Sequence, residues 1–161
     1  MGYRRVFIIR KDLHLSSGKL AAMVAPCAEV YWTRMIKNDV MPLRKGGFKS
    51  WDAPPSEDDA DIIMYNAELC IDADIFEQYI NGSFVKTICQ ARNKNHLLKA
   101  KTIATELGLT EGVDFGEIND KCLTELTPEN EDGTTLVGIW FKPLPDEVAH
   151  KISKKYHLYM D

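Results

Sequence analysis

Short apolar runs recur along the chain, separated by stretches in which apolar residues follow helical spacing. The first run, Val6 to Ile9, is continuously apolar and β-branched, which is typical of a strand buried on both faces. Phe84 to Cys89, Val113 to Ile118 and Thr135 to Phe141 have similar character. These patterns predict four strands of one central sheet.

A first helix is predicted directly after the first strand. Apolar residues recur at helical spacing from Leu20 to about Met35. Ser16 or Ser17 offers a hydroxyl that caps the helix start. Pro26 lies inside the pattern and lacks an amide donor, at a cost on the order of 3 kcal/mol in a helix interior, so we expect a kink there.

Two further helices are predicted later in the chain. One begins after the cap residue Asn93 and ends at Gly108, and the last begins at Pro145, which suits a first helical turn. The alternation of strands and helices predicts an α/β fold with layers: a mixed four-stranded central sheet with helices on both faces.

The part of the chain after the first helix is predicted to be an insertion, at about residues 37–82 of a single domain of residues 1–161. Periodicity disappears from Ile36 to about Asp61, where prolines, glycines and acidic residues dominate, so we expect a long loop. Ile62 to Tyr65 is predicted to pair with Glu68 to Ile71 as a hairpin across Asn66 and Ala67. A short helix is expected from Asp74 to Ile80.

Composition narrows the class of protein. The chain has 45% hydrophobic residues within 161, enough for one domain to bury its own core. No apolar run is long enough to cross a membrane, and Arg10 and Lys11 interrupt the first run before a signal peptide can form. We therefore expect a cytoplasmic protein without a membrane partner. The net charge of −4 argues against general coating of nucleic acid but leaves room for a local basic face.

Cofactor chemistry has no support in the sequence. The chain has no dinucleotide-binding glycine motif, no GxSxG and no HExxH. The cysteines lack metal-ligand spacing and are expected to be reduced and mostly buried, without disulfides: Cys27, Cys70, Cys89 and Cys122. We expect no cofactor and no metal.

One lysine, Lys19, stands in the first turn of the first predicted helix. The helix macrodipole disfavours a cation there by some tenths of a kcal/mol. In one interpretation its ammonium and the nearby amides hold an anionic or oxyanion-forming group. In the other, Lys19 is a solvated surface lysine. The residues alone leave both open.

The segment that contains Lys19 carries a family resemblance. From Arg10 to Ala22 it matches the pattern RxDLxxxxGKxAA of the second-class, archaeal and eukaryotic, peptidyl-tRNA hydrolases. Residues 104–109 resemble the family's AKxLGL helix end, Asp120 and Thr124 its IxDAGRTQ segment, and residues 133–139 its GTxTVLxIG strand. The closing segment, residues 151–159, is similar as well. Order and spacing agree over roughly residues 4–36 and 84–159.

The resemblance implies an ester hydrolase that releases free tRNA from peptidyl-tRNA. Lys19, Asp120, Thr124 and Thr135 are the matching positions around the scissile ester. We expect Asp120 to orient and deprotonate the attacking water and Lys19 to stabilise the oxyanion. Thr124 would hold the water or a ribose oxygen, and Thr135 would support the site. On the residues alone, Asp120 equally fits a turn after a strand.

The resemblance also implies tRNA or peptidyl-tRNA as partner, and a homodimer, for which Trp32 or Trp51 is a candidate contact. Substrate binding is expected of three residues near the first helix: Arg10, Asp12 and Gly18. A basic face for tRNA is expected from Arg4, Arg5, Lys11, Arg92 and Lys94. The alternative for these cations is an ordinary solvated surface.

Several positions depart from the family pattern. Met23 stands where the family usually has Gln, Pro26 where it has His, and Leu123 where it has Arg. Lys121 and Cys122 replace an Ala-Gly pair. A second function therefore remains open: a catalytically inactive hydrolase-like module that binds a nucleic acid or protein partner.

Overall fold

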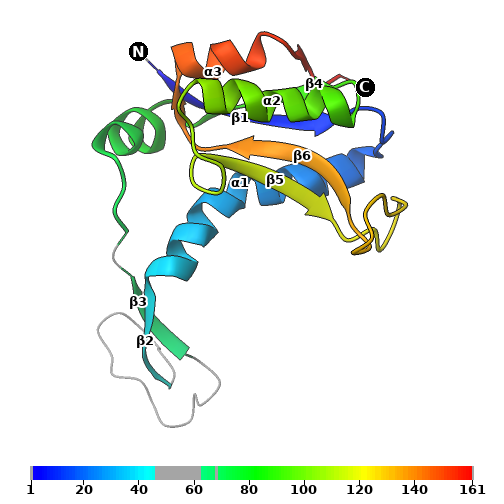
Figure 1. The fold of residues 1–161 in the computed structure, drawn as a ribbon. Coiled ribbons are helices and arrows are strands. Elements are labelled where there is room, and N and C mark those ends of the chain that lie inside the picture. The colour runs from blue at the N-terminus through cyan, green and yellow to red at the C-terminus, as the bar shows by residue number, and fades with distance from the viewer. Residues whose placement is uncertain (1, 46–62, 68, 161) are drawn as a thin grey trace. The chain divides into compact units, whose positions relative to one another are not determined.

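A mixed sheet forms the centre of the protein in the computed structural model (Figure 1), which describes residues 2–45, 63–67 and 69–160, with side chains described for 2–36 and 69–160. The six strands of this sheet are β1 Tyr3–Arg10, β4 Val85–Ala91, β5 Phe115–Asp120, β6 Thr135–Phe141, β7 Leu144–Pro145 and β8 His157–Leu158. Their order is β5-β6-β1-β4-β8, and β7 also pairs with β1. Strands β1 and β4 are parallel, whereas the other pairs are antiparallel.

The predicted mixed sheet is confirmed, but it has six strands where four were expected. The two missed strands, β7 and β8, are each two residues long. So short a strand shows no alternation in the sequence, and only its pairing to a neighbour identifies it.

Helices cover both faces of the sheet, as predicted. They are α1 Ser17–Asp39, the π-helical segment η1 Ile75–Ser83, α2 Lys94–Glu106 and α3 Asp146–Ser153. Figure 1 shows the first part of α1, up to Tyr31, on one face and α2 and α3 on the other. Helix α1 runs through Pro26 as one element. The side chain of Asn93 caps α2 by accepting a hydrogen bond from His96 N at 2.9 Å, which confirms the predicted cap.

The predicted hairpin is wrong. Strand β3, Ile63–Ala67, pairs antiparallel with β2, Val40–Lys45, rather than with the residues that follow it. Asn66 and Ala67, predicted as the turn, lie inside β3 and pair with Met41 and Val40. Turn propensity is a weak local signal, and a distant strand outweighs it by supplying the ladder of backbone hydrogen bonds. The predicted long loop is wrong at its start, because α1 continues to Asp39 and β2 spans Val40–Lys45. The rest of that prediction, residues 46–61, lies outside the described residues.

The chain divides into two compact units. One comprises Met1–Tyr31 with Ile71–Asp161 and holds the six-stranded sheet, and the other comprises Trp32–Cys70 and holds the β2-β3 pair. Every residue of the candidate site described below belongs to the first unit. No helix within the described ranges has the length and apolarity that a membrane crossing requires.

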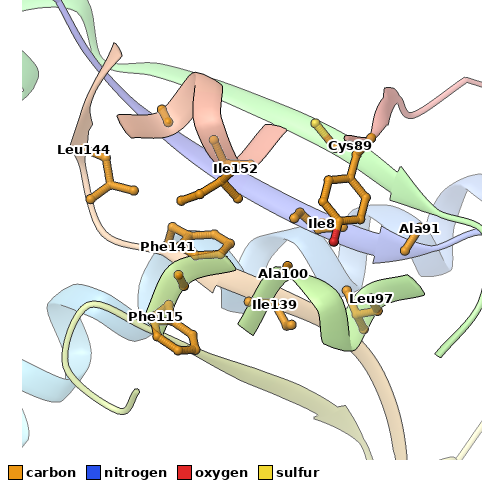
Figure 2. Close-up of a cluster of buried hydrophobic side chains, with 14 of the residues drawn as sticks. Ile8, Cys89, Ala91, Leu97, Ala100, Phe115, Ile139, Phe141, Leu144 and Ile152 are labelled. Atoms are coloured by element: carbon orange, nitrogen blue, oxygen red, sulfur yellow. The ribbon is translucent and has the colours of Figure 1, made fainter. Parts of the chain in front are cut away.

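The hydrophobic core lies between the sheet and the α2 and α3 layer (Figure 2). Phe115 and Phe141 stack at 5.7 Å between ring centroids, and Leu97 of α2 and Ile152 of α3 are fully buried against the same cluster. Burying a side chain of this size contributes on the order of 1.5 to 3 kcal/mol. This packing fixes the strand ends that carry the site.

On the opposite face, a buried arginine ties α1 to the sheet. Arg5 is fully buried, and its guanidinium donates to the carbonyl oxygens of Phe141 at 2.9 Å, Cys27 at 2.8 Å and Ala28 at 2.5 Å. Burial lowers the pKa of Arg5, and the ring of Tyr31 lies 5.7 Å from its guanidinium carbon. Arg5 therefore has a structural role, and it does not reach the surface predicted for tRNA.

All four cysteines are free thiols, of which only Cys27 and Cys89 are buried. Burial raises the pKa of Cys27 to about 12 and that of Cys89 to about 11, so both behave as small apolar residues. Cys70 is exposed and Cys122 is half-buried. The prediction of mostly buried thiols thus holds for half of them.

Candidate active site

Lys19 lies in the first turn of α1, the helix that follows the carboxyl end of β1. Ser16 caps this helix, because its hydroxyl accepts a hydrogen bond from Lys19 N at 3.2 Å and its carbonyl accepts from Leu20 N at 2.8 Å. Lys19 is the third residue after the cap. Capped helices commonly have Glu or Gln at this position, with a side chain that reaches back to the cap amide. In this protein the position holds a lysine whose side chain points elsewhere.

The missing carboxylate comes from a distant loop. Glu125 accepts hydrogen bonds from the backbone amide of Ser16, at 3.2 Å, and from the Ser16 hydroxyl. A negative charge at a helix start also offsets the macrodipole. Glu125 therefore joins the first turn of α1 to the loop after β5. It accepts the hydrogen bond from the Ser16 amide that a lysine at position 19 cannot accept.

Three predicted site residues meet at this junction. The ammonium of Lys19 lies 2.7 Å from Oδ2 of Asp120 and 3.1 Å from Oγ1 of Thr124. The Lys19 and Asp120 side chains are only 11% and 9% exposed, so water screens their attraction weakly. Lys19 and Asp120 are 101 positions apart in the sequence, and the sheet brings their elements together.

The geometry leaves donors free for a bound molecule. An ammonium group has three N–H bonds. Among the described residues, only Asp120 and Thr124 accept from the Lys19 ammonium, so one N–H remains available. The Thr124 oxygen accepts from Lys19, and its own hydroxyl hydrogen is therefore free to be donated. A cation, a carboxylate and a hydroxyl donor thus converge on one point.

A strained turn holds the carboxylate of Asp120. Asp120 is the last residue of β5, and its Oδ1 accepts a hydrogen bond from the Cys122 amide at 2.8 Å. Cys122 has a φ of 54°, in the left-handed region that favours glycine, and it occupies the position of a glycine in the family pattern. The turn orients the acid even without glycine, although a side chain there carries strain.

Thr135 supports the site without reaching it. Asp120 and Thr135 are paired in the β5-β6 ladder, and Thr135 is fully buried. Its hydroxyl donates to the carbonyl of Thr127 at 2.9 Å and accepts from the Glu129 amide at 3.0 Å. Thr135 therefore holds the loop between β5 and β6, the loop that carries Thr124 and Glu125.

Arg10 supports the same loop from β1. Its guanidinium contacts Asp12 at 2.8 and 3.2 Å, Glu129 at 2.7 Å through both carboxylate oxygens, and the Leu136 carbonyl at 2.9 Å. These contacts use all of the N–H donors that a guanidinium has. The hydrogen bonds raise the pKa of Arg10 and lower that of Glu129. Arg10 and Asp12, predicted to bind substrate, are engaged with each other and with this loop.

The residues predicted for the tRNA face are dispersed. Arg4 pairs with Asp146 at 2.6 Å, and Lys94 lies 3.6 Å from Glu129. The Lys11 ammonium donates to the Met160 carbonyl and lies 4.7 Å from the centre of the Tyr159 ring. Arg5 is buried, and Arg92 is exposed. Of the predicted set, Arg92 is the cation that faces solvent without an ion pair to a described carboxylate.

The positions that depart from the family pattern lie on α1 and in the loop after β5. Met23 and Pro26 are half-buried and follow Lys19 along one side of α1 at helical spacing. Leu123 is 84% exposed beside Thr124. A side chain at Gly18 would meet nothing within 4 Å among the described atoms, so the approach to the helix start is open. These departures change the surroundings of the Lys19, Asp120 and Thr124 cluster and leave its contacts in place.

Sequence reasoning missed two of the residues that build the site. Glu125 directly follows Thr124 and stands where the family segment IxDAGRTQ has its Gln. This position was the signal in the sequence that could have identified Glu125. Glu129 lies 119 positions from Arg10 in an irregular loop, and nothing in the local sequence links the two.

Comparison with known proteins gives one family over nearly the whole chain. The family model described as Peptidyl-tRNA hydrolase PTH2 matches residues 3–159. Two curated relatives, each named "Peptidyl-tRNA hydrolase", come from Thermococcus sibiricus and Thermococcus onnurineus. Each is 26% identical over 151 residues, which covers 94% of this chain and 92% of the relative.

Proposed function

The chain belongs to the Peptidyl-tRNA hydrolase PTH2 family, and on that basis we propose that it hydrolyses the ester of peptidyl-tRNA, or of a related N-blocked aminoacyl-tRNA, to release free tRNA. The observation that supports this proposal most directly is the contact of Lys19 with Asp120 at 2.7 Å and with Thr124 at 3.1 Å. Hydrolysis of an ester requires a base for water and a cation for the oxyanion, and these side chains supply both.

Asp120 is the base in the proposed mechanism. Its Oδ1 is held by the Cys122 amide and its Oδ2 by Lys19, and each carboxylate oxygen keeps a further lone pair for a water hydrogen. The water oxygen attacks the ester carbonyl carbon while one of its protons passes to Asp120. The carbonyl oxygen becomes an oxyanion in the tetrahedral intermediate.

Lys19 stabilises that intermediate. Its remaining N–H points to the oxyanion, and the low exposure of the Lys19 and Asp120 pair strengthens the attraction. The bond between the carbonyl carbon and the ribose oxygen then breaks, and the ribose oxygen takes the proton from Asp120. Thr124 donates its hydroxyl hydrogen to the attacking water or to a ribose oxygen, and Thr135 acts as a positioning residue for the loop.

The partners and location follow from the same proposal. The substrate is a tRNA ester, the proposed chemistry runs without a cofactor, and the protein works in the cytoplasm. We also propose a homodimer, as the resemblance implied. Trp32 is half-buried, and Trp51 lies outside the described residues.

The experiment that tests the proposed function measures release of free tRNA from a radiolabelled N-acetyl-aminoacyl-tRNA by the purified protein. We expect activity well above buffer in the wild type and losses on the order of 10²-fold or more in Lys19→Ala and Asp120→Ala. Thermal unfolding of each variant serves as the control for folding.

The same assay addresses the inactive-module alternative. If the folded wild type releases no more tRNA than buffer, the hydrolase proposal fails, and the substitutions at Met23, Pro26 and Leu123 become the signs of a binding module that lost turnover. If both variants keep wild-type rates while the wild type is active, hydrolysis occurs and the proposed roles of Lys19 and Asp120 fail.

A further inference from the structure

A second set of polar side chains lies away from the candidate active site, between α2 and the segment after α3. Two adjoining pockets of about 480 and 230 Å³ share Arg92, His96 and Lys155. The larger pocket is also lined by Lys99, Thr102, Ile103, Glu106 and Tyr156, and the smaller one by Gln90 and His157. Neither pocket includes Lys19 or Asp120. The volume of the larger pocket is in the range that holds a nucleotide-sized ligand.

Two residues that line the larger pocket, His96 and Tyr156, are held by contacts with each other and with Arg92. The His96 ring stacks on Tyr156 at 4.6 Å between centroids, and its Nδ1 accepts the Arg92 amide at 3.1 Å. The Tyr156 hydroxyl donates to the His96 carbonyl at 3.0 Å. Burial, together with the charges of Arg92 and Lys99, lowers the pKa of His96, and burial raises that of Tyr156 to about 12. Both rings are therefore neutral at pH 7.

The charge of the larger pocket comes from three cations. Arg92, Lys99 and Lys155 are all exposed, and within the described part of the chain none of them forms an ion pair with a carboxylate. Lys101 on the same helix, in contrast, contacts Glu111 at 2.7 Å and Glu117 at 2.6 Å. Glu106 is the one carboxylate that lines the pocket, so the pocket keeps a net positive charge. Unpaired cations around a pocket with few carboxylates suit a phosphate-bearing ligand.

The pocket begins at the sheet edge that carries the candidate active site. Arg92 directly follows β4, whose last residue, Ala91, pairs with Arg10 of β1 and accepts a hydrogen bond from Lys11 N at 2.8 Å. Lys99 lies further along α2 from that edge. An extended polyanion whose end occupies the active site would therefore meet Arg92 first and the pocket beyond it.

We propose that this pocket, with Arg92, Lys99 and Lys155, is a subsite for backbone phosphates of the tRNA, separate from the catalytic cluster and on the α2 side of the sheet. This inference rests on the proposed function, because the identity of the polyanion follows from the tRNA substrate. The pocket supplies affinity for the tRNA body and takes no part in bond cleavage. Phosphate contacts position a nucleic acid and do not read its sequence, so binding here is indifferent to tRNA identity.

The test compares two double variants that remove the same charge. Lys99→Gln/Lys155→Gln changes two lining residues, and Lys151→Gln/Lys154→Gln changes two exposed lysines at the end of α3 that line neither pocket. Binding of deacylated tRNA is measured by equilibrium titration at salt concentrations from about 50 to 200 mM, a range over which affinity that depends on phosphate contacts falls strongly.

We expect the lining variant to weaken tRNA binding about tenfold at the lower salt and to reduce the slope of log K against log salt by about 2, since each phosphate that a lysine neutralises adds about 0.9 to that slope. In turnover the loss appears in KM for N-acetyl-aminoacyl-tRNA. The control variant is expected to keep the wild-type slope. An equal change in both variants assigns binding to net charge, and an unchanged slope in the lining variant removes the subsite; either result overturns the proposal.

The binding readout separates this inference from the proposed function. A wild type that hydrolyses no ester but whose tRNA affinity depends on Lys99 and Lys155 supports the subsite and overturns the hydrolase. A wild type that hydrolyses the ester with a salt slope independent of these lysines does the reverse. Saturable binding of a mononucleotide that requires the two lysines, with tRNA affinity unaffected by their removal, also overturns the proposal.

Discussion

Cations are arranged in two opposite ways in two regions of this protein. Near the carboxyl ends of β1 and β5, two cations of low exposure contact carboxylates: Lys19 contacts Asp120, and Arg10 contacts Asp12 and Glu129. Along α2 and the segment after α3, Arg92, Lys99 and Lys155 are exposed and contact no described carboxylate. The first arrangement fixes geometry, and the second leaves charge free for a ligand.

The difference teaches what each region is suited to do. A paired cation of low exposure is held in one position, which a chemical step needs because reacting groups must lie within hydrogen-bond range. An unpaired, solvated cation keeps its attraction for a polyanion at a distance, and salt screens that attraction. Substitutions in the first region should therefore change kcat or folding, and those in the second should change affinity.

The largest effect is expected from removing the base while keeping its shape. Asp120→Asn preserves the size of the side chain and its place at the end of β5 but removes the negative charge beside Lys19. We expect kcat for N-acetyl-aminoacyl-tRNA to fall on the order of 10² to 10⁴-fold, with a smaller change in KM. Steady-state kinetics measures this split. A rise in KM at constant kcat would contradict the assignment of Asp120 to chemistry.

The next effect concerns stability. Arg10→Met leaves two carboxylates facing each other without their cation, and we expect the free energy of unfolding to fall by about 2 to 3 kcal/mol. This estimate is below the roughly 3 to 5 kcal/mol of a fully buried pair, because Asp12 and Glu129 are each 33% exposed. Denaturant unfolding measures the change in the free energy of unfolding. The control is Lys142→Met, which also replaces a cation by methionine but removes an ion pair with a single carboxylate, Asp114.

The Arg10 network also predicts a pH dependence. The hydrogen bond from Arg10 holds the pKa of Glu129 below its ordinary value of 4.5. Ionised Glu129 therefore contributes stability above that pH, and the contribution is lost as the pH falls through its lower folded-state pKa. As the pH is lowered from neutral to acidic, the free energy of unfolding should fall less in Glu129→Gln than in the wild type. Equal acid sensitivity in both proteins would falsify this role.

A smaller effect is expected from removing the contact between Glu125 and Ser16 at the start of α1. Glu125→Ala removes both hydrogen bonds to Ser16, and we expect kcat to fall about fivefold, equivalent to roughly 1 kcal/mol, because the Lys19 turn loses its tie to the Thr124 loop. Glu125→Gln keeps one carbonyl oxygen for the Ser16 amide and should restore most of the rate. Equal losses in both variants would point to the charge of Glu125 rather than to positioning.

The smallest effect is expected at the strained turn. Cys122→Gly relieves the left-handed φ of 54° and should raise the free energy of unfolding by about 0.5 to 1 kcal/mol. The amide that holds Asp120 remains in the variant, because the backbone supplies it. Thermal unfolding measures the gain. A loss of stability would show that the thiol packing outweighs the strain.

The elements with strong local patterns could be predicted from the sequence. Val6 to Ile9 lies within β1, Thr135–Phe141 matches β6, and Asn93 caps α2, because buried strands and caps require residue types that stand close together in the chain. The pairing of β2 with β3 was missed, and so were β7 and β8, since a partner distant in sequence defines each of them. Local propensity does not identify a distant partner.

The candidate site divides in the same way. The sequence by itself determined which residue types are present, and it selected Lys19, Asp120 and Thr124 through their match to a family pattern. Only the tertiary structure decided that Glu125 completes the helix cap, that Arg10 is occupied by Asp12 and Glu129, and that Arg5 is buried. The physical reason is that charge pairing acts over a few ångströms in space. The sheet brings residues that are a hundred positions apart within that distance, and the order of residues along the chain does not record it.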